Sequence, residues 1–287
     1  MSCPDCFRGT IHEGTPTGKE ETIHNVLTYV AAPETGSTSN SKSKIIFITD
    51  VFGFNLVNNK LLADKYAAAT GCEVLVPSVI PGGGAPLSAI ELFDSLSTPV
   101  GLLDLTGQTK RAGAAVRAAK IFAPFAVRTR NAYPKLLNFS RDVKASLPPG
   151  AKLAVAGFCW GGMHSTKLTA EPAVQGGSVS LFDAHFVAHP AGLRVPDDFS
   201  AAANKFRVPI SFAVGDLDMV LSKDKVEAIE SSLKESYGEK SGDFEVKTYS
   251  SCKHGFAVRA DPKRAVEDEA AMQAAAQASN WFKKYLL

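Results

Sequence analysis

The chain has 287 residues, of which 45% are hydrophobic and 21% are charged, and its formal charge is +2. This composition excludes a mainly disordered chain, and a chain of this length can bury a large core without disulfides or metals. The near balance of 31 basic and 29 acidic residues argues against nucleic-acid binding. No apolar stretch has the length of a signal peptide or a membrane-spanning helix, so we expect a cytoplasmic protein without a membrane partner.

Short apolar runs alternate with helical patterns along the chain, after a polar arm or early hairpin over residues 1–24. The apolar runs predict strands at 25–31, 44–49, 73–77, 152–156, 178–189, 209–214 and 244–249. Spacing and end signals predict helices at 57–70, 110–121, 131–145, 163–169, 222–237 and 261–285. This alternation predicts a single α/β domain over residues 25–287, with a mostly parallel sheet and helices on both faces.

Residues 78–130 interrupt the alternation. They begin with the flexible sequence PGGGAPLS and continue with mixed apolar residues. A connection of this length is usually a lid or a binding loop, so we expect a lid-like insertion here. In an open α/β sheet the ligand lies beyond the carboxyl ends of the strands, and every candidate site residue is expected at that edge.

The sequence Gly157-Phe158-Cys159-Trp160-Gly161 follows a predicted buried strand and opens a predicted helix. This context is typical of a nucleophile elbow, a tight turn that lifts a nucleophile above the sheet. The helix N-terminus favours a thiolate at Cys159, and the Trp160 N–H would face the oxygen of a bound carbonyl group. The alternative interpretation is that Cys159 is a buried structural cysteine.

A thiol nucleophile needs a base, and the base needs a residue that orients it. His254 follows the last predicted strand and is the favoured base, with His189, in a His-Pro corner, as the competing residue. The orienting acid should follow a strand between Cys159 and His254, which leaves Asp216 and Asp218 open. We favour Asp218, because it lies further into the loop and can reach back to an imidazole.

The loop after the strand at 44–49 is expected to supply the second oxyanion donor. Val51 is the natural candidate for that N–H group, and Asp50 is placed to contact the thiol or the base. A separate hypothesis rests on Cys3 and Cys6, whose C-x-x-C spacing occurs in redox pairs and in half of a zinc site. No second pair accompanies them, so we expect no metal site, and reduced thiols are the default for all five cysteines.

Together these motifs resemble the dienelactone hydrolase family of the α/β-hydrolase fold, and in particular its fungal branch. The resemblance rests on TDVFG at 49–53, GFCWGG at 157–162, GDLD at 215–218 and HGFAVR at 254–259. It extends from about residue 25 to the end of the chain and implies hydrolysis without a cofactor.

By this resemblance Cys159 is the nucleophile, Asp218 the acid and His254 the base. The N–H groups of Val51 and Trp160 form the oxyanion hole.

The resemblance also implies that Asp50, Phe52 and Arg259 lie at the substrate. Asp50 occupies the position of a glutamate that holds the resting thiol in bacterial members, and Arg259 is the nearest match to an arginine that binds a substrate carboxylate. We therefore expect a cysteine-dependent hydrolase that opens lactones or carboxylic esters through an acyl-thioester. A non-catalytic protein that binds small molecules on the same fold is the alternative. The oligomeric state stays open.

Overall fold

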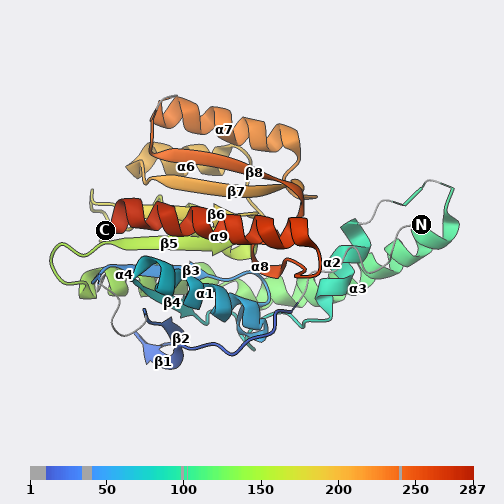
Figure 1. Ribbon diagram of the computed structural model, residues 1–287, viewed down its shortest axis with the longest axis horizontal. Helices are drawn as coiled ribbons and strands as arrows, with labels where there is room; N and C mark the ends of the chain where they lie inside the picture. The colour runs from blue at the N-terminus through green and yellow to red at the C-terminus, as the bar shows by residue number, and fades with distance from the viewer. Residues whose placement is uncertain (1–10, 34–40, 98–99, 102, 239–240) are drawn as a thin grey trace.

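An eight-stranded sheet runs through the computed structural model, which describes residues 11–33, 41–97, 100–101, 103–238 and 241–287 (Figure 1). The strand order is β1-β2-β4-β3-β5-β6-β7-β8. The strands are β1 (Lys19–Ile23), β2 (Val26–Ala31), β3 (Lys44–Ile48), β4 (Glu73–Pro77), β5 (Leu153–Phe158), β6 (Ala184–Ala188), β7 (Ile210–Leu217) and β8 (Phe244–Lys253). Strand β2 pairs in antiparallel fashion with both β1 and β4, and β3 to β8 are parallel to one another. The predicted mostly parallel α/β sheet is therefore confirmed.

Helices cover both faces of this sheet. They are α1 (Val57–Thr70), α2 (Ala89–Ser97), α3 (Leu105–Thr129), α4 (Ala132–Ser146), α5 (Trp160–Leu168), α6 (Asp197–Phe206), α7 (Lys223–Tyr237), α8 (Phe256–Arg259) and α9 (Ala265–Leu286), with a short 3₁₀ helix, η2 (Gly53–Asn55). The side chains of α1 and α9 pack in one core layer, and those of α4, α6 and α7 pack in two clusters on the opposite side.

Strand β3 shows why its sequence belongs in the middle of the sheet. Successive side chains of a strand point to opposite faces, so a central strand must be apolar at every position. Ile45 and Phe47 enter the core shared with α1 and α9, whereas Ile46 and Ile48 enter the core shared with α4. All four side chains are buried.

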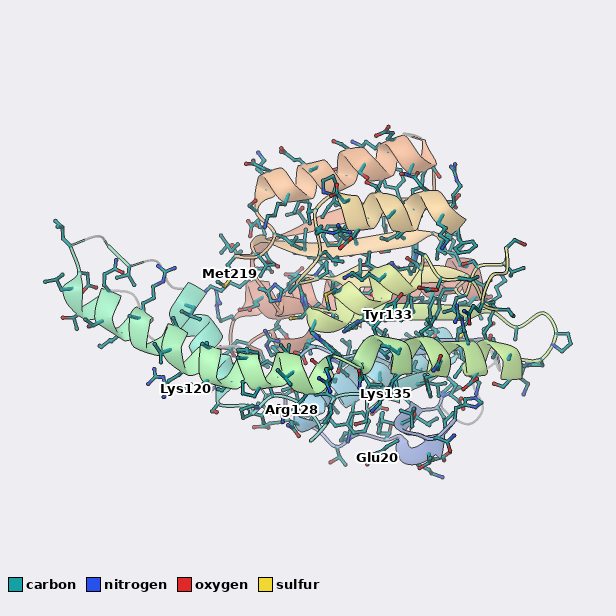
Figure 2. All side chains as sticks on the ribbon, turned by 180° about the vertical axis from the view of Figure 1, so that it is seen from behind. Glu20, Lys120, Arg128, Tyr133, Lys135 and Met219 are labelled. Atoms are coloured by element: carbon teal, nitrogen blue, oxygen red, sulfur yellow. The ribbon has the colours of Figure 1, made fainter. Side chains whose placement is uncertain are left out.

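Helices α2 and α3 extend well beyond the sheet on one side (Figure 1). Lys120 and Arg128 lie on the outside of α3, as Figure 2 shows from behind. The buried residues of α3 are Ala114, Phe125 and Thr129, which form one stripe along the helix. These two helices account for most of the expected insertion at 78–130.

Several element bounds differ from the sequence prediction. The helix predicted at 110–121 is α3, which begins at Leu105 and continues past Pro124 to Thr129. The helices α2 and α6 were not predicted. The last helix begins at Ala265 rather than at Asp261, because Asp261 makes a local turn in which its carboxylate accepts the Lys263 N–H.

The parallel strands β3, β5, β7 and β8 all end at the same edge of the sheet. Asp50, Cys159, Asp218 and His254 follow these four strands within two residues of their ends. The topology thus brings together chain segments about 200 residues apart. Among the helices that the structure describes, none combines the length and the apolar character that crossing a membrane requires.

Candidate active site

The turn between β5 and α5 holds Cys159 in an unusual backbone conformation, with φ 53° and ψ −116°. Its neighbours explain why glycines flank it. A Cβ on Gly157 would lie 2.1 Å from the Ser165 hydroxyl, and a Cβ on Gly161 would lie 2.3 Å from two backbone carbonyl oxygens of the β3 segment. The strand and the helix can approach each other only because both positions lack a side chain. Cys159 is 6% exposed and lines a cavity.

His254 contacts the carboxylate of Asp218 directly. Its Nδ1 lies 2.9 Å from Oδ2 and 3.1 Å from Oδ1 of Asp218, whose side chain is fully buried. The backbone N–H groups of Val220 and Leu221 donate to the same carboxylate and fix its orientation.

The other open acid, Asp216, does not reach His254. It is exposed and accepts the N–H of Cys252 and the hydroxyl of Ser250. Between the two carboxylates, the geometry favours Asp218 as the partner of His254.

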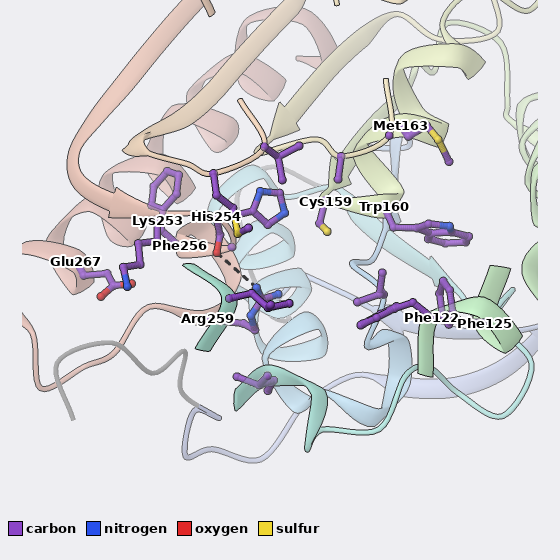
Figure 3. A pocket seen from close by; sticks show the side chains of 18 residues that line it. Phe122, Phe125, Cys159, Trp160, Met163, Lys253, His254, Phe256, Arg259 and Glu267 are labelled. Atoms are coloured by element: carbon purple, nitrogen blue, oxygen red, sulfur yellow. Dashed lines mark hydrogen bonds between the residues drawn. The ribbon is translucent and has the colours of Figure 1, made fainter. Parts of the chain in front are cut away.

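The imidazole of His254 also lies beside the side chain of Cys159, and Figure 3 shows the two side chains next to each other on the cavity wall. Burial by itself would lower the pKa of His254. The negative charges of the Cys159 sulfur and the Asp218 carboxylate, with their hydrogen bonds, outweigh burial and raise that pKa to about 10. These neighbours favour the imidazolium form of the ring.

The cavity has a volume of about 400 Å³ and mostly apolar walls. Phe122 and Phe125 of α3 line it opposite Cys159, with Trp160 beside them (Figure 3). The remaining lining residues are Val51, Ile90, Leu96, Met163, Ala191, Gly192, Met219, Val220, Lys253, His254, Gly255, Phe256, Arg259 and Glu267. The sequence analysis did not identify the lining side chains of α2 and α3. The spacing of Phe122 and Phe125, which places both rings on one helix face, was the available signal.

The two candidate oxyanion donors, Val51 and Trp160, both line this cavity. The Trp160 N–H is the first of α5, and the first N–H groups of a helix have no acceptor within it. Within the described residues, the Val51 N–H also has no hydrogen-bond acceptor. Both N–H groups are thus available to a bound carbonyl oxygen.

Asp50, Phe52 and Arg259 form a cluster beside the cavity. Arg259 lines it, but Asp50 and Phe52 do not. The Asp50 carboxylate accepts the Arg259 guanidinium at 2.6 Å, the Phe52 N–H at 3.1 Å and the Asn59 amide at 3.1 Å. Asp50 was expected to contact the thiol or the base. Its carboxylate instead forms an ion pair with Arg259.

The competing base, His189, packs against the ring of His254. The two ring centroids are 5.1 Å apart and nearly perpendicular. His189 is fully buried, its ring nitrogens have no partner among the described residues, and burial lowers its pKa well below the ordinary value. The neutral His189 ring therefore packs against His254 without adding a second positive charge.

No group of three or more His, Cys, Asp or Glu side chains in the described part of the chain could hold a metal ion. Cys3 and Cys6, the basis of the redox hypothesis, lie outside the described residues.

A mostly parallel sheet, a nucleophile elbow after a central strand, and a carboxylate and a histidine after later strands define an α/β hydrolase. The chain matches the dienelactone hydrolase family over residues 26–286 and belongs to that family, which makes it a hydrolase of the dienelactone hydrolase type. The resemblance expected from the sequence motifs is confirmed.

Similar proteins support this assignment. The hydrolase pyvD of Aspergillus violaceofuscus is 27% identical over 281 residues, which cover 98% of this chain and 96% of that protein. The Dienlactone hydrolase 1 of Gibberella moniliformis is 27% identical over 256 residues, which cover 88% and 82%. Carboxyl esterase 2 of Tuber melanosporum has a similar fold, with a TM-score of 0.52, 15% identity and coverage of 98% and 92%.

Proposed function

We propose that this protein hydrolyses carboxylic esters or lactones with Cys159 as nucleophile, His254 as general base and acid, and Asp218 as the residue that orients His254. The observation that carries the proposal is the placement of His254, which lines the cavity next to Cys159 and whose Nδ1 lies 2.9 Å from the Asp218 carboxylate. The cavity is mostly apolar, with a volume of about 400 Å³, large enough for a small ester or lactone.

In the first half of the reaction the sulfur attacks the carbonyl carbon. The imidazolium of His254 beside it favours the anionic, nucleophilic form of the sulfur. The carbonyl oxygen becomes negative and accepts the N–H groups of Val51 and Trp160, each worth about 2.7–4 kcal/mol in comparable enzymes. When the C–O bond to the alcohol part breaks, His254 gives its proton to the departing oxygen. An acyl-thioester on Cys159 remains.

The second half needs His254 as a base. An acylated sulfur carries no negative charge, so one of the two charges that raise the pKa of His254 is lost at this stage. The neutral ring then accepts a proton from water, and the hydroxide formed attacks the thioester carbon. Asp218 keeps the proton on Nδ1, which leaves Nε2 free to act. Departure of the thiolate restores the resting site. We also propose that Arg259, which contacts Asp50 and Phe52, lies next to the bound substrate.

The test compares Cys159→Ala with Cys72→Ala, a control that removes another buried thiol. Turnover of para-nitrophenyl acetate and of a small lactone is followed in both variants. Cys159→Ala should abolish turnover above background, and Cys72→Ala should retain it. Equal activity in both variants would exclude the cysteine mechanism. A wild-type protein that turns over neither substrate and reacts slowly with iodoacetamide would instead support the non-catalytic binding protein.

A further inference from the structure

One positive charge at the cavity, that of Arg259, is already paired with a carboxylate. Arg259 lines the cavity, and its guanidinium lies 2.6 Å from the Asp50 carboxylate. The side chain of Arg259 is 7% exposed and that of Asp50 is not exposed at all. Water therefore screens this pair weakly, and the two charges cancel at short range.

Other contacts keep the guanidinium in place. Its centre lies 5.1 Å from the centre of the Phe52 ring, and Nη2 lies 3.5 Å from the His254 carbonyl oxygen, along the dashed line in Figure 3. Gly255 leaves room for it, since a Cβ there would lie 2.1 Å from Nη2. The arginine is thus fixed against the protein on several sides rather than extended into the cavity.

Lys253 also reaches the cavity, on the side where Glu267 lines it. Figure 3 shows the Lys253 side chain directed toward the Glu267 carboxylate. Arg259 and Lys253 therefore each have a carboxylate on their side of the cavity, and the third cationic group of the lining, His254, contacts the Asp218 carboxylate. The opposite wall, formed by Phe122, Phe125 and Trp160, offers ring surfaces in edge-to-face contact with one another.

We propose that the substrate of this site is a neutral, apolar ester or lactone, and that Asp50 sets this preference by neutralising Arg259. The inference rests on the proposed hydrolase function. A carboxylate on the substrate that approached Arg259 would meet the negative charge of Asp50 as well, so repulsion by Asp50 offsets much of the attraction by Arg259. The anionic substrate then gains little to compensate for leaving water, which disfavours it by about tenfold or more. An apolar group instead meets the aromatic wall without such a penalty.

The experiment compares two esters of the same length and leaving group, para-nitrophenyl hexanoate and the para-nitrophenyl half-ester of adipic acid. The half-ester carries a terminal carboxylate where the hexanoate has a methyl group. The quantity measured is the ratio of kcat/KM for the hexanoate to kcat/KM for the half-ester, after subtraction of the rate with Cys159→Ala. We expect a ratio of at least about ten in the wild-type protein.

Asp50→Asn should lower this ratio by at least about tenfold, because it leaves the positive charge of Arg259 uncompensated. Asp183→Asn is the matched control, since it removes the carboxylate of a different ion pair, with Lys144, away from the cavity. It should leave the ratio unchanged. Arg259→Gln provides a second variant should Asp50→Asn not fold, and it should keep the ratio at ten or above.

The outcomes separate this inference from the proposed function. A wild-type preference for the half-ester, or a selective loss of half-ester turnover in Arg259→Gln, would overturn the neutral-substrate inference while cysteine-dependent hydrolysis stands. An unchanged ratio in a folded Asp50→Asn would show that Asp50 does not set the preference. Turnover that survives in Cys159→Ala, or no turnover of either ester, would remove the proposed function and this inference with it.

Discussion

Replacing Asp218 by Asn tests the arrangement around His254 with the smallest change of shape. The Asn oxygen can still accept the N–H groups of Val220 and Leu221, so the loop after β7 should keep its conformation. The Asn amide, however, would present an N–H to Nδ1 of His254. The ring would then place its proton on Nε2, where the thiol and the substrate need an acceptor.

The size of the effect follows from the pKa of His254. Its rise from 6.5 to about 10 corresponds to about 5 kcal/mol in favour of the imidazolium, net of burial, and Asp218 and Cys159 supply this jointly. Because burial opposes them, the two groups together contribute more than this net figure. We therefore expect Asp218→Asn to lower kcat/KM by about a hundredfold to ten-thousandfold, with a fall in the pKa of His254.

The assay is the pH profile of kcat/KM for para-nitrophenyl hexanoate, with Asp216→Asn as the matched control. Asp216 lies two residues away, is exposed and does not contact His254. Its replacement should change kcat/KM less than about threefold. A larger loss in Asp216→Asn than in Asp218→Asn, or an Asp218→Asn enzyme within threefold of the wild type, would refute the reasoning.

Other consequences can be measured separately. Iodoacetamide should alkylate Cys159 faster than Cys72 or Cys252, because Cys159 lines the cavity beside His254 whereas burial raises the pKa of the other two thiols; equal labelling of the three would contradict this. Gly161→Ala should lower the free energy of unfolding by at least about 2 kcal/mol, since the new Cβ would lie 2.3 Å from backbone oxygen atoms. The control Gly113→Ala lies within α3 with no atom near the new Cβ, and it should raise the free energy of unfolding by about 0.5–1 kcal/mol. Burial lowers the pKa of His185 to about 3, so as the pH falls below about 6.5 the unfolded chain binds a proton at this residue before the folded chain does. Urea unfolding should therefore show that His185 lowers the free energy of unfolding by about 2 kcal/mol between pH 6.5 and 5. In His185→Asn the free energy of unfolding should depend less on pH in this range.

The parts of the fold that depend on local signals could be predicted from the sequence. The helix predicted at 131–145 is α4, Ala132–Ser146, because the following Leu-Pro-Pro-Gly sequence cannot continue a helix. The extent of α3 could not be predicted. The prediction ended at residue 121, yet the helix continues past Pro124 to Thr129, where Phe125 and Thr129 are buried in the body of the protein.

The residues of the candidate site were likewise predictable only where local signals mark them. Cys159 and His254 each follow a strand that is visible in the sequence, and the parallel order of the strands places them at one edge. The pairing of Asp50 with Arg259 joins residues 209 positions apart and depends on how two loops pack. No local pattern reports such a contact, which is why the sequence suggested a thiol or base partner for Asp50 instead.

The backbone conformation at Cys159 determines how a substitution at this position affects stability. Its dihedral angles lie where side chains are rarely found, and such conformations cost about 1–3 kcal/mol. Glycine would relax that strain, so Cys159→Gly should melt at a higher temperature than the wild-type chain while losing its chemistry. Stability alone therefore favours glycine over cysteine at this position, and only a function of the side chain would offset that cost.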